Sequence, residues 1–276
     1  MEQVLKTMLE NVRTKSPLVH NITNYVTVND VANVLLAAGG SPIMSDDADD
    51  VEDITSICGG LNINIGTLNK NTIPSMFLAG KKANALGHIV LLDPVGAGAS
   101  RLRTDTANRL MQEVRFDAVR GNISEIKTLC TGSGSTKGVD ADAVDAVTEA
   151  NLDDGVALVK AFAKQTGCII AVTGAIDLVS DGARCWCIRN GRAEMSRITG
   201  TGCQLSALMT AFLVANPDHK LDAAAAAVCM MGLAGEIGWA NMQPGDGNST
   251  YRNRIIDAIF NMTGDALEEG AKYELR

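Results

Sequence analysis

The sequence predicts an α/β fold, a mostly parallel central sheet with helices on both faces. Short apolar runs that end in Gly, Asp or Asn alternate with longer helical patterns, a rhythm typical of βα units. Glycine is abundant (27 residues) and proline scarce (6), which suits a layered fold with many tight turns. The chain has 276 residues, 46% of them hydrophobic, and no linker, repeat or low-complexity segment divides it. We therefore expect residues 1–276 to form a single domain.

The individual elements follow from the local patterns. The apolar runs predict strands at residues 60–66, 88–96, 117–122 and 167–174, and the intervening patterns predict helices at 72–86, 104–113, 141–150 and 155–166. Residues 178–195 are expected to form two strands joined through Asn190-Gly191, a typical hairpin turn. Beyond Gly202 the chain is almost entirely helical in pattern, with helices expected at 203–215, 221–238 and 249–268. The first seventeen residues have the charge spacing of an amphipathic helix.

Composition narrows the class of function. A formal net charge of −8 argues against nucleic acid as a partner, because neutralising phosphates takes clustered Lys and Arg. The longest apolar run, residues 223–235, is shorter than the roughly 20 residues that span a bilayer, so we expect no membrane partner. The seven cysteines form no C-x-x-C pair, which is typical of reduced thiols and predicts a cytoplasmic protein. The acidic run at residues 45–53 lacks EF-hand spacing and is expected to be a solvated loop that leads into a helix.

Four motifs follow expected strands and carry the chemistry. They are "DPVGAG", "RGNISE", "VTGAID" and "ITGTGC". In a parallel sheet the carboxyl ends of the strands meet at one edge, where ligands bind. We therefore expect the four motifs to converge on one site.

The motif "TGTGC" resembles an anion-binding loop. Gly200 and Gly202 let the backbone approach a ligand closely, and the amides of Thr201, Gly202 and Cys203 would open the following helix. These amides and the helix dipole would stabilise a phosphoryl group during transfer. The alternative is an ordinary glycine turn with a threonine cap before a helix.

The motif "RGNISE" adds charged groups to the same edge. Asn122 and Glu125 are three residues apart, so both would face one ligand from the start of a helix. Carboxylate oxygens suit Mg²⁺, and Asp93 supplies a second carboxylate at a neighbouring strand end. Each residue also has a plain structural interpretation, with Glu125 capping a helix and Asp93 starting a turn. Taken with Arg120, the set favours a phosphate-plus-magnesium site.

These motifs resemble those of the hydroxyethylthiazole kinase family, which has the single-domain, three-layer ribokinase-like fold. The matching segments cover nearly the whole chain in the family's order: "SPLVHNITNYVTVNDVAN", "AAGGSPIMSDD", "LDPVGAGAS", "RGNISEI", "VTGAIDLVSDG" and "ITGTGCQLSAL". Departures are confined to residues 131–154 and to the C-terminal tail. The resemblance implies an enzyme that uses ATP and Mg²⁺ to phosphorylate the primary alcohol of 4-methyl-5-(2-hydroxyethyl)thiazole in thiamine salvage.

The resemblance also implies roles for particular residues. Met44 and Gly200 would contact the thiazole, and Gly200, Thr201 and Gly202 would form the catalytic loop. Family members are trimers with interfacial substrate sites, which would bring His20 and Asn24 beside a neighbour's site. The remaining residues would bind ATP (Arg120, Thr173, Asn122) and organise Mg²⁺ and water (Asp93, Glu125).

Cys203 stands where most ribokinase-like enzymes place an aspartate that accepts the hydroxyl proton. A thiol at a helix N-terminus is expected to have a lowered pKa, so its thiolate could act as the base. It could also be a passive neighbour that shapes the pocket, or a covalent nucleophile.

Two rival functions remain at this point. A cysteine hydrolase or acyltransferase would need a histidine base near Cys203, and of the three histidines only His20 could approach. A non-catalytic binding relative is disfavoured because Gly200, Gly202, Asp93 and Glu125 are all present.

Overall fold

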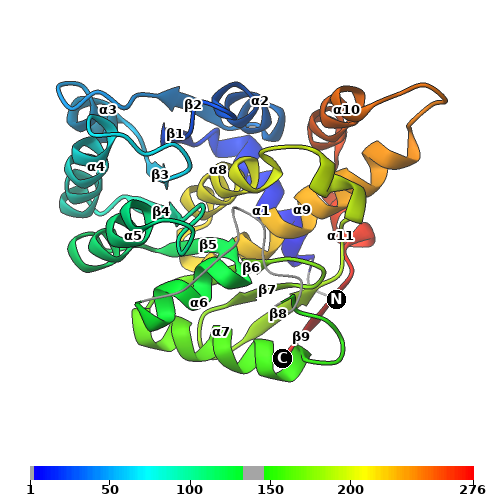
Figure 1. Cartoon of the computed structure of the whole chain (residues 1–276). Helices are drawn as coiled ribbons and strands as arrows, with labels where there is room; N and C mark the ends of the chain where they lie inside the picture. The colour runs from blue at the N-terminus through cyan, green and yellow to red at the C-terminus, as the bar shows by residue number, and fades with distance from the viewer. Residues whose placement is uncertain (1–2, 133–145) are drawn as a thin grey trace.

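The structure is a computed structural model that describes residues 3–132 and 146–276, and in these residues a nine-stranded sheet lies between two layers of helices (Figure 1). The strand order is β2-β1-β3-β4-β5-β6-β7-β8-β9. Strands β1 to β6 are parallel and the last three are antiparallel. The strands are β1 (Leu18–Ile22), β2 (Ser41–Met44), β3 (Gly60–Asn64), β4 (Ile89–Asp93), β5 (Ala118–Asn122), β6 (Ile169–Thr173), β7 (Asp177–Ser180), β8 (Cys185–Ile188) and β9 (Tyr273–Leu275).

The helices form two hydrophobic cores, one on each face of the sheet. Alternate strand residues point to opposite faces, so Leu91 packs in one core and Leu92 in the other. The first core contains α1, α8, α9, α10 and α11, and the second contains α4 to α7. The helices are α1 (Val4–Lys15), α2 (Val28–Ala38), α3 (Val51–Ile57), α4 (Thr72–Leu86), α5 (Arg101–Glu113), α6 (Ile123–Thr131), α7 (Leu152–Thr166), α8 (Thr201–Ala215), α9 (Lys220–Ala240), α10 (Asn248–Asn261) and α11 (Gly264–Gly270), with 3₁₀ turns η1 (Ala193–Arg197) and η2 (Pro217–His219).

The predicted α/β fold class is confirmed. The four expected strands correspond to β3, β4, β5 and β6, and the helices expected after them include α4, α5 and α7. The amphipathic N-terminal helix is α1, and the acidic run leads into α3 as expected. Strands β1, β2 and β9 were not predicted, because β2 and β9 have only four and three residues and β1 mixes apolar residues with His20 and Asn21.

The predicted hairpin turn at Asn190-Gly191 is wrong. The turn lies earlier, between β7 and β8, where the Asp181 carboxylate accepts hydrogen bonds from the amides of Ala183 (2.8 Å) and Arg184 (2.7 Å). Asn190 instead follows β8 and donates to the carbonyl of Gly270. An Asx turn held by two amides therefore outweighs the Asn-Gly signal.

Two helix predictions also need correction. The helix expected at 249–268 is broken at residues 262–263, because Met262 is extended and Thr263 caps a second helix by accepting from the amide of Ala266. Of the helix expected at 141–150, residues 141–145 lie outside the described residues, and residues 146–150 are non-helical, ending in a turn.

One helix among the described residues is long and apolar enough to cross a membrane by length and composition alone. It runs from Pro217 to Ala240 and includes α9. However, 78% of its apolar window is buried inside the protein, in the core with α8 and α10. Burial of this kind is typical of a core helix in a globular domain.

Candidate phosphotransfer site

The anion-binding loop lies at the carboxyl edge of the sheet, as predicted. Gly200 is the N-cap of α8 and has a φ of +89°, a conformation that side-chain-bearing residues rarely adopt. A Cβ on Gly200 would also collide with the side chain of Thr27. The helix begins at Thr201, so the first amides of α8 have no partner in a preceding turn and are the kind of donors that can bind an anion.

Arg120 brings a positive charge to this loop. Its Nη2 donates to Thr173 Oγ1 (2.5 Å), and its Nη1 lies 3.6 Å from Asp93 Oδ1. The guanidinium packs so closely on Gly202 that a Cβ there would be 2.5 Å from Nη1. Arg120, Thr173 and Gly202, predicted separately, are therefore neighbours in space.

Asp93 is fully buried at the end of β4. Its Oδ2 accepts hydrogen bonds from Asn64 Nδ2 (2.8 Å) and Ser206 Oγ (2.8 Å). Its Oδ1 makes no hydrogen bond among the described residues and lies 3.6 Å from the Arg120 guanidinium. Burial raises the pKa of Asp93. Asp93 thus presents one unbonded carboxylate oxygen to the site.

Glu125 joins two loops of the site. Its Oε1 accepts from the amide of Gly96 (2.7 Å) and its Oε2 from the amide of Asn122 (2.8 Å). Asn122 accepts in turn from the amide of Glu125, so the two residues form a capping box at the start of α6. Burial, with the nearby Asp93 charge, raises the pKa of Glu125 to about 7. The capping interpretation of Glu125 is therefore correct, and it places the carboxylate close to Asp93.

Asp93 and Glu125 fit the requirements of a Mg²⁺ site. No cluster of three or more His, Cys, Asp or Glu able to hold a metal occurs among residues 3–132 and 146–276. Two carboxylates suffice for Mg²⁺ at a nucleotide, because this ion keeps several waters and also binds phosphate oxygens. The buried, unbonded Asp93 Oδ1 is the kind of group that such an ion would satisfy.

Cys203 lies on the first turn of α8 and is almost fully buried. Asn24 Nδ2 donates to its sulfur (3.1 Å). Burial and the Asp93 charge raise the pKa of the thiol, so the predicted lowering is wrong. Desolvation of the thiolate here outweighs the favourable end of the helix dipole.

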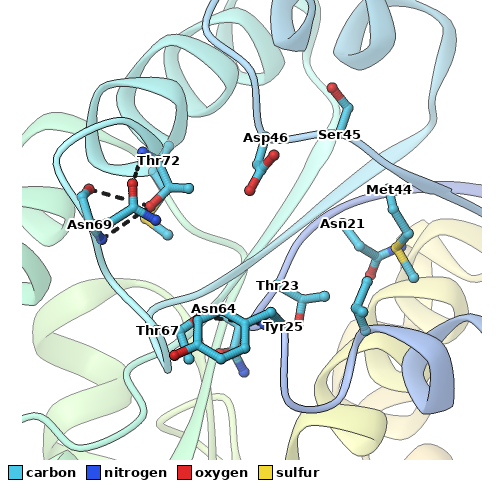
Figure 2. A pocket seen from close by; sticks show the side chains of 12 residues that line it. Asn21, Thr23, Tyr25, Met44, Ser45, Asp46, Asn64, Thr67, Asn69 and Thr72 are labelled. Carbon is cyan, nitrogen blue, oxygen red and sulfur yellow. Dashed lines mark hydrogen bonds between the residues drawn. The ribbon is translucent and has the colours of Figure 1, made fainter.

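A cavity of about 160 Å³ opens beside these groups (Figure 2). Three segments that follow β1, β2 and β3 line it. Figure 2 shows Asp46 facing Asn69 and Thr72 across the cavity, with Met44 and Asn21 on one side. The lining residues are Asn21, Thr23, Tyr25, Val28, Met44, Ser45, Asp46, Asn64, Thr67, Asn69, Thr72 and Met76. Met44, the expected substrate contact, is one of these lining residues.

His20 is buried in β1 and is not among the residues that line the cavity. Its Nδ1 is 3.0 Å from Thr55 Oγ1 and its Nε2 is 2.9 Å from the carbonyl oxygen of Ser45. Burial also lowers the pKa of His20. With both ring nitrogens engaged, His20 is not placed to activate Cys203, which argues against the hydrolase alternative.

Sequence reasoning missed two polar residues of the site, Asn64 and Ser206. Asn64 is the last residue of β3 and bonds Asp93 and Asn24, while Ser206 reaches Asp93 from α8. The available signal was the alternation of asparagines with apolar residues in "GLNINIG", since a buried strand rarely carries amides without partners.

The order of elements and the central sheet define the ribokinase-like class of fold. The solved pyridoxal kinase from Staphylococcus aureus in complex with AMP-PCP and pyridoxal shares this fold, with a TM-score of 0.60 at 14% identity over 94% of this chain and 98% of that one. More specifically, the hydroxyethylthiazole kinase family model matches residues 9–265, and the chain belongs to this family.

Individual relatives agree with the family assignment. A hydroxyethylthiazole kinase from Clostridium acetobutylicum is 58% identical, covering 98% of this chain and 99% of the relative. The solved hydroxyethylthiazole kinase protein of Pyrococcus horikoshii OT3 is 32% identical with a TM-score of 0.87, covering 99% of this chain and 98% of that one. The protein is therefore a phosphotransferase.

Proposed function

We propose that the protein transfers the γ-phosphoryl group of ATP to the primary alcohol of 4-methyl-5-(2-hydroxyethyl)thiazole, a step of thiamine salvage in the cytoplasm. The observation that carries the proposal is the position of Asn64. This residue lines the cavity and also hydrogen-bonds Asp93, so an alcohol bound in the cavity would lie next to a phosphate group held near Asp93. Phosphoryl transfer depends mainly on such positioning and on charge neutralisation.

The nucleotide end of the site comprises Arg120, Thr173 and Asn122. Arg120 would neutralise charge on the phosphates, because its guanidinium is held at the mouth of the anion-binding loop. Gly200, Thr201 and Gly202 would place the first amides of α8 where charge develops in the transition state.

Asp93 and Glu125 would hold Mg²⁺, either directly or through water. Bound there, the ion would neutralise phosphate charge beside Arg120. Glu125 has both oxygens on backbone amides, so its contact with the ion would be mediated by water more readily than that of Asp93 Oδ1.

The alcohol end of the site comprises Met44, Asn24 and Gly200, with His20 supporting the segment after β2. Cys203 would act here as a neutral thiol that shapes the pocket, since its pKa is raised and the reaction requires little base assistance. This assignment favours the passive role over the base, and the covalent role has no histidine partner.

A homotrimer with substrate sites at its interfaces is supported by the open side of the cavity. Tyr25 lines the cavity and is nevertheless 78% exposed, and the adjacent Val26 is 56% exposed. A neighbouring subunit that covers them would close the pocket. Light scattering of the purified protein is expected to give three times the chain mass. Val26→Asp is expected to shift the protein to monomers, and a monomeric wild type would contradict the trimer.

A coupled ADP-release assay tests the substrate. We expect ATP- and Mg²⁺-dependent turnover with the thiazole alcohol and at least about tenfold lower kcat/KM with hydroxymethylpyrimidine, because each missing contact is worth roughly 1–3 kcal/mol. Turnover with the pyrimidine alone would refute the proposal.

A further inference from the structure

We propose that Asn64 is a positioning residue of the phosphotransfer reaction, which sets the orientation of Asp93 and links it by hydrogen bonds to Asn24 and, through Asn24, to Cys203. This inference rests on the proposed function. Asn64 ends β3 and lies opposite Asp93 in the β3–β4 register. Its side chain is buried and bonds the neighbours on both sides.

The direction of the Asn64 amide is determined by the backbone. The amide N–H of Gly66 donates to Asn64 Oδ1 (2.9 Å), so the oxygen must face that turn. The Nδ2 group is then left to face Asp93, and it donates to Oδ2 (2.8 Å). A flipped side chain would set its NH₂ group against the Gly66 N–H, at a cost of about 1–3 kcal/mol for each buried group left unsatisfied.

This direction decides which oxygen of Asp93 faces the phosphate site. Asn64 and Ser206 both donate to Oδ2, which occupies that oxygen with two hydrogen bonds. Oδ1 is consequently the oxygen left unbonded, 3.6 Å from Arg120 Nη1. Asn64 thus determines that Oδ1 is the Asp93 oxygen that faces Arg120.

On its other side Asn64 is hydrogen-bonded to Asn24, which extends the chain of hydrogen bonds to Cys203. Asn24 Oδ1 accepts from the amide (3.2 Å) and hydroxyl (3.1 Å) of Thr27, which fixes the direction of the Asn24 side chain. Its Nδ2 therefore donates to Asn64 Oδ1 (3.1 Å) and to Cys203 Sγ (3.1 Å). Because the sulfur accepts this bond, its own proton points away from Asn24.

Asn64→Ala is expected to lower kcat about 100-fold. Without the Asn64 hydrogen bond the Asp93 carboxylate would shift by about 1 Å, and a displacement of that size in an active site costs about 100-fold in rate. KM for ATP should change less than about threefold, since Arg120 and the α8 amides remain in place. A kcat within about threefold of wild type would overturn the proposal.

Asn216→Ala is the matched control for general destabilisation. Asn216 is also buried, and it also makes three hydrogen bonds with its amide, to the side chain of Asn11 and the carbonyls of Met8 and Phe212. It lies just beyond the opposite end of α8. Both alanine variants should lose a similar amount of Tm, but only Asn64→Ala should lose kcat. Equal kcat losses in the two variants would show that Asn64 acts only through stability.

Asn64→Asp tests the hydrogen-bond donor of the Asn64 side chain separately from its acceptor oxygen. The oxygen that accepts from Gly66 and Asn24 is retained, while a carboxylate oxygen replaces the donor that faces Asp93. Its kcat is expected to be no higher than that of Asn64→Ala. Wild-type kcat in Asn64→Asp would mean that donation to Asp93 is not needed, which would overturn the proposal.

A crystal structure of Asn64→Ala distinguishes failure of this proposal from failure of the proposed function. If wild type does not turn over the thiazole alcohol, the proposed function is contradicted, whereas the orientation of Asp93 can still be measured. We expect the carboxylate to rotate in the variant so that Oδ1 no longer faces Arg120. An unchanged Asp93 would contradict the positioning role whichever substrate is used.

Discussion

Gly202→Ala tests whether Arg120 must occupy the mouth of the anion-binding loop. The new Cβ would lie 2.5 Å from Arg120 Nη1 and 2.6 Å from Nη2. The guanidinium is the far end of a flexible side chain, so it would swing away while the backbone of α8 stays in place. This displacement breaks the hydrogen bond from Arg120 to Thr173 and moves the guanidinium away from Asp93.

The expected effect on Gly202→Ala activity is much larger than the effect on stability. Losing a charge-assisted hydrogen bond costs about 1.5–3 kcal/mol, and replacing a helical glycine by alanine returns up to about 1 kcal/mol. The remaining loss of about 0.5–2 kcal/mol corresponds to roughly 1–8 °C in Tm. Removing one preorganised electrostatic group from a transition state lowers kcat by about 10²–10³.

The assay for Gly202→Ala combines ADP release with thermal unfolding. The control is Gly247→Ala, because Gly247 precedes α10 and a Cβ there would meet nothing within 4 Å. The control should keep its kcat and lose at most about 1 kcal/mol of stability as an N-cap change. A Gly202→Ala enzyme with kcat within about threefold of wild type would refute the role given to Arg120.

Three further predictions follow from the site. Between pH 4.5 and about 7 folded Glu125 keeps a proton that the unfolded chain has released, so unfolding free energy falls as pH rises, by at most about 3 kcal/mol. Urea melts at pH 5 and pH 8 should show this slope, and Glu125→Gln should reduce it; an undiminished slope would exclude Glu125 as its source. In steady-state kinetics Met44→Ala should raise KM for the thiazole alcohol about tenfold, because it removes about 1.5 kcal/mol of apolar contact, and should leave KM for ATP unchanged. An equal rise in both KM values would argue that Met44 does not contact the substrate. Cys203→Ala should lower kcat less than about tenfold, whereas a loss of 10² or more would restore the base role.

Much of the fold was accessible from local sequence patterns. Runs such as "HIVLLDPVG" are apolar on both faces because helices cover the sheet on both sides, and they end where β4 ends. Because ligands bind at the carboxyl ends of parallel strands, the sequence alone predicted that Asp93, Arg120 and Gly202 lie at one site. These features depend on periodicity and strand ends, which a sequence displays directly.

Other features depend on tertiary partners. The Asn190-Gly191 pair has the residues of a hairpin turn, but Glu236 and Gly270, remote in sequence, bond it in a different role. The pKa of Cys203 depends on burial and on Asp93, neither of which its helix position reveals. A prediction from local sequence fails where a residue distant in sequence changes the relative free energies of the possible local conformations or protonation states.

The hydrogen bonds around Asn64 show how such distant groups determine chemistry. The amide N–H groups of Gly66 and Thr27 set the direction of two asparagines, and those asparagines determine which atoms of Asp93 and Cys203 are already occupied. Each of these orientations follows because a buried polar group must be hydrogen-bonded. Leaving such a group unpaired costs more free energy than a hydrogen bond contributes. The orientation of the site therefore originates in two turns of the backbone, so substitutions at those turns should alter kcat although neither residue has been assigned a part in the chemistry.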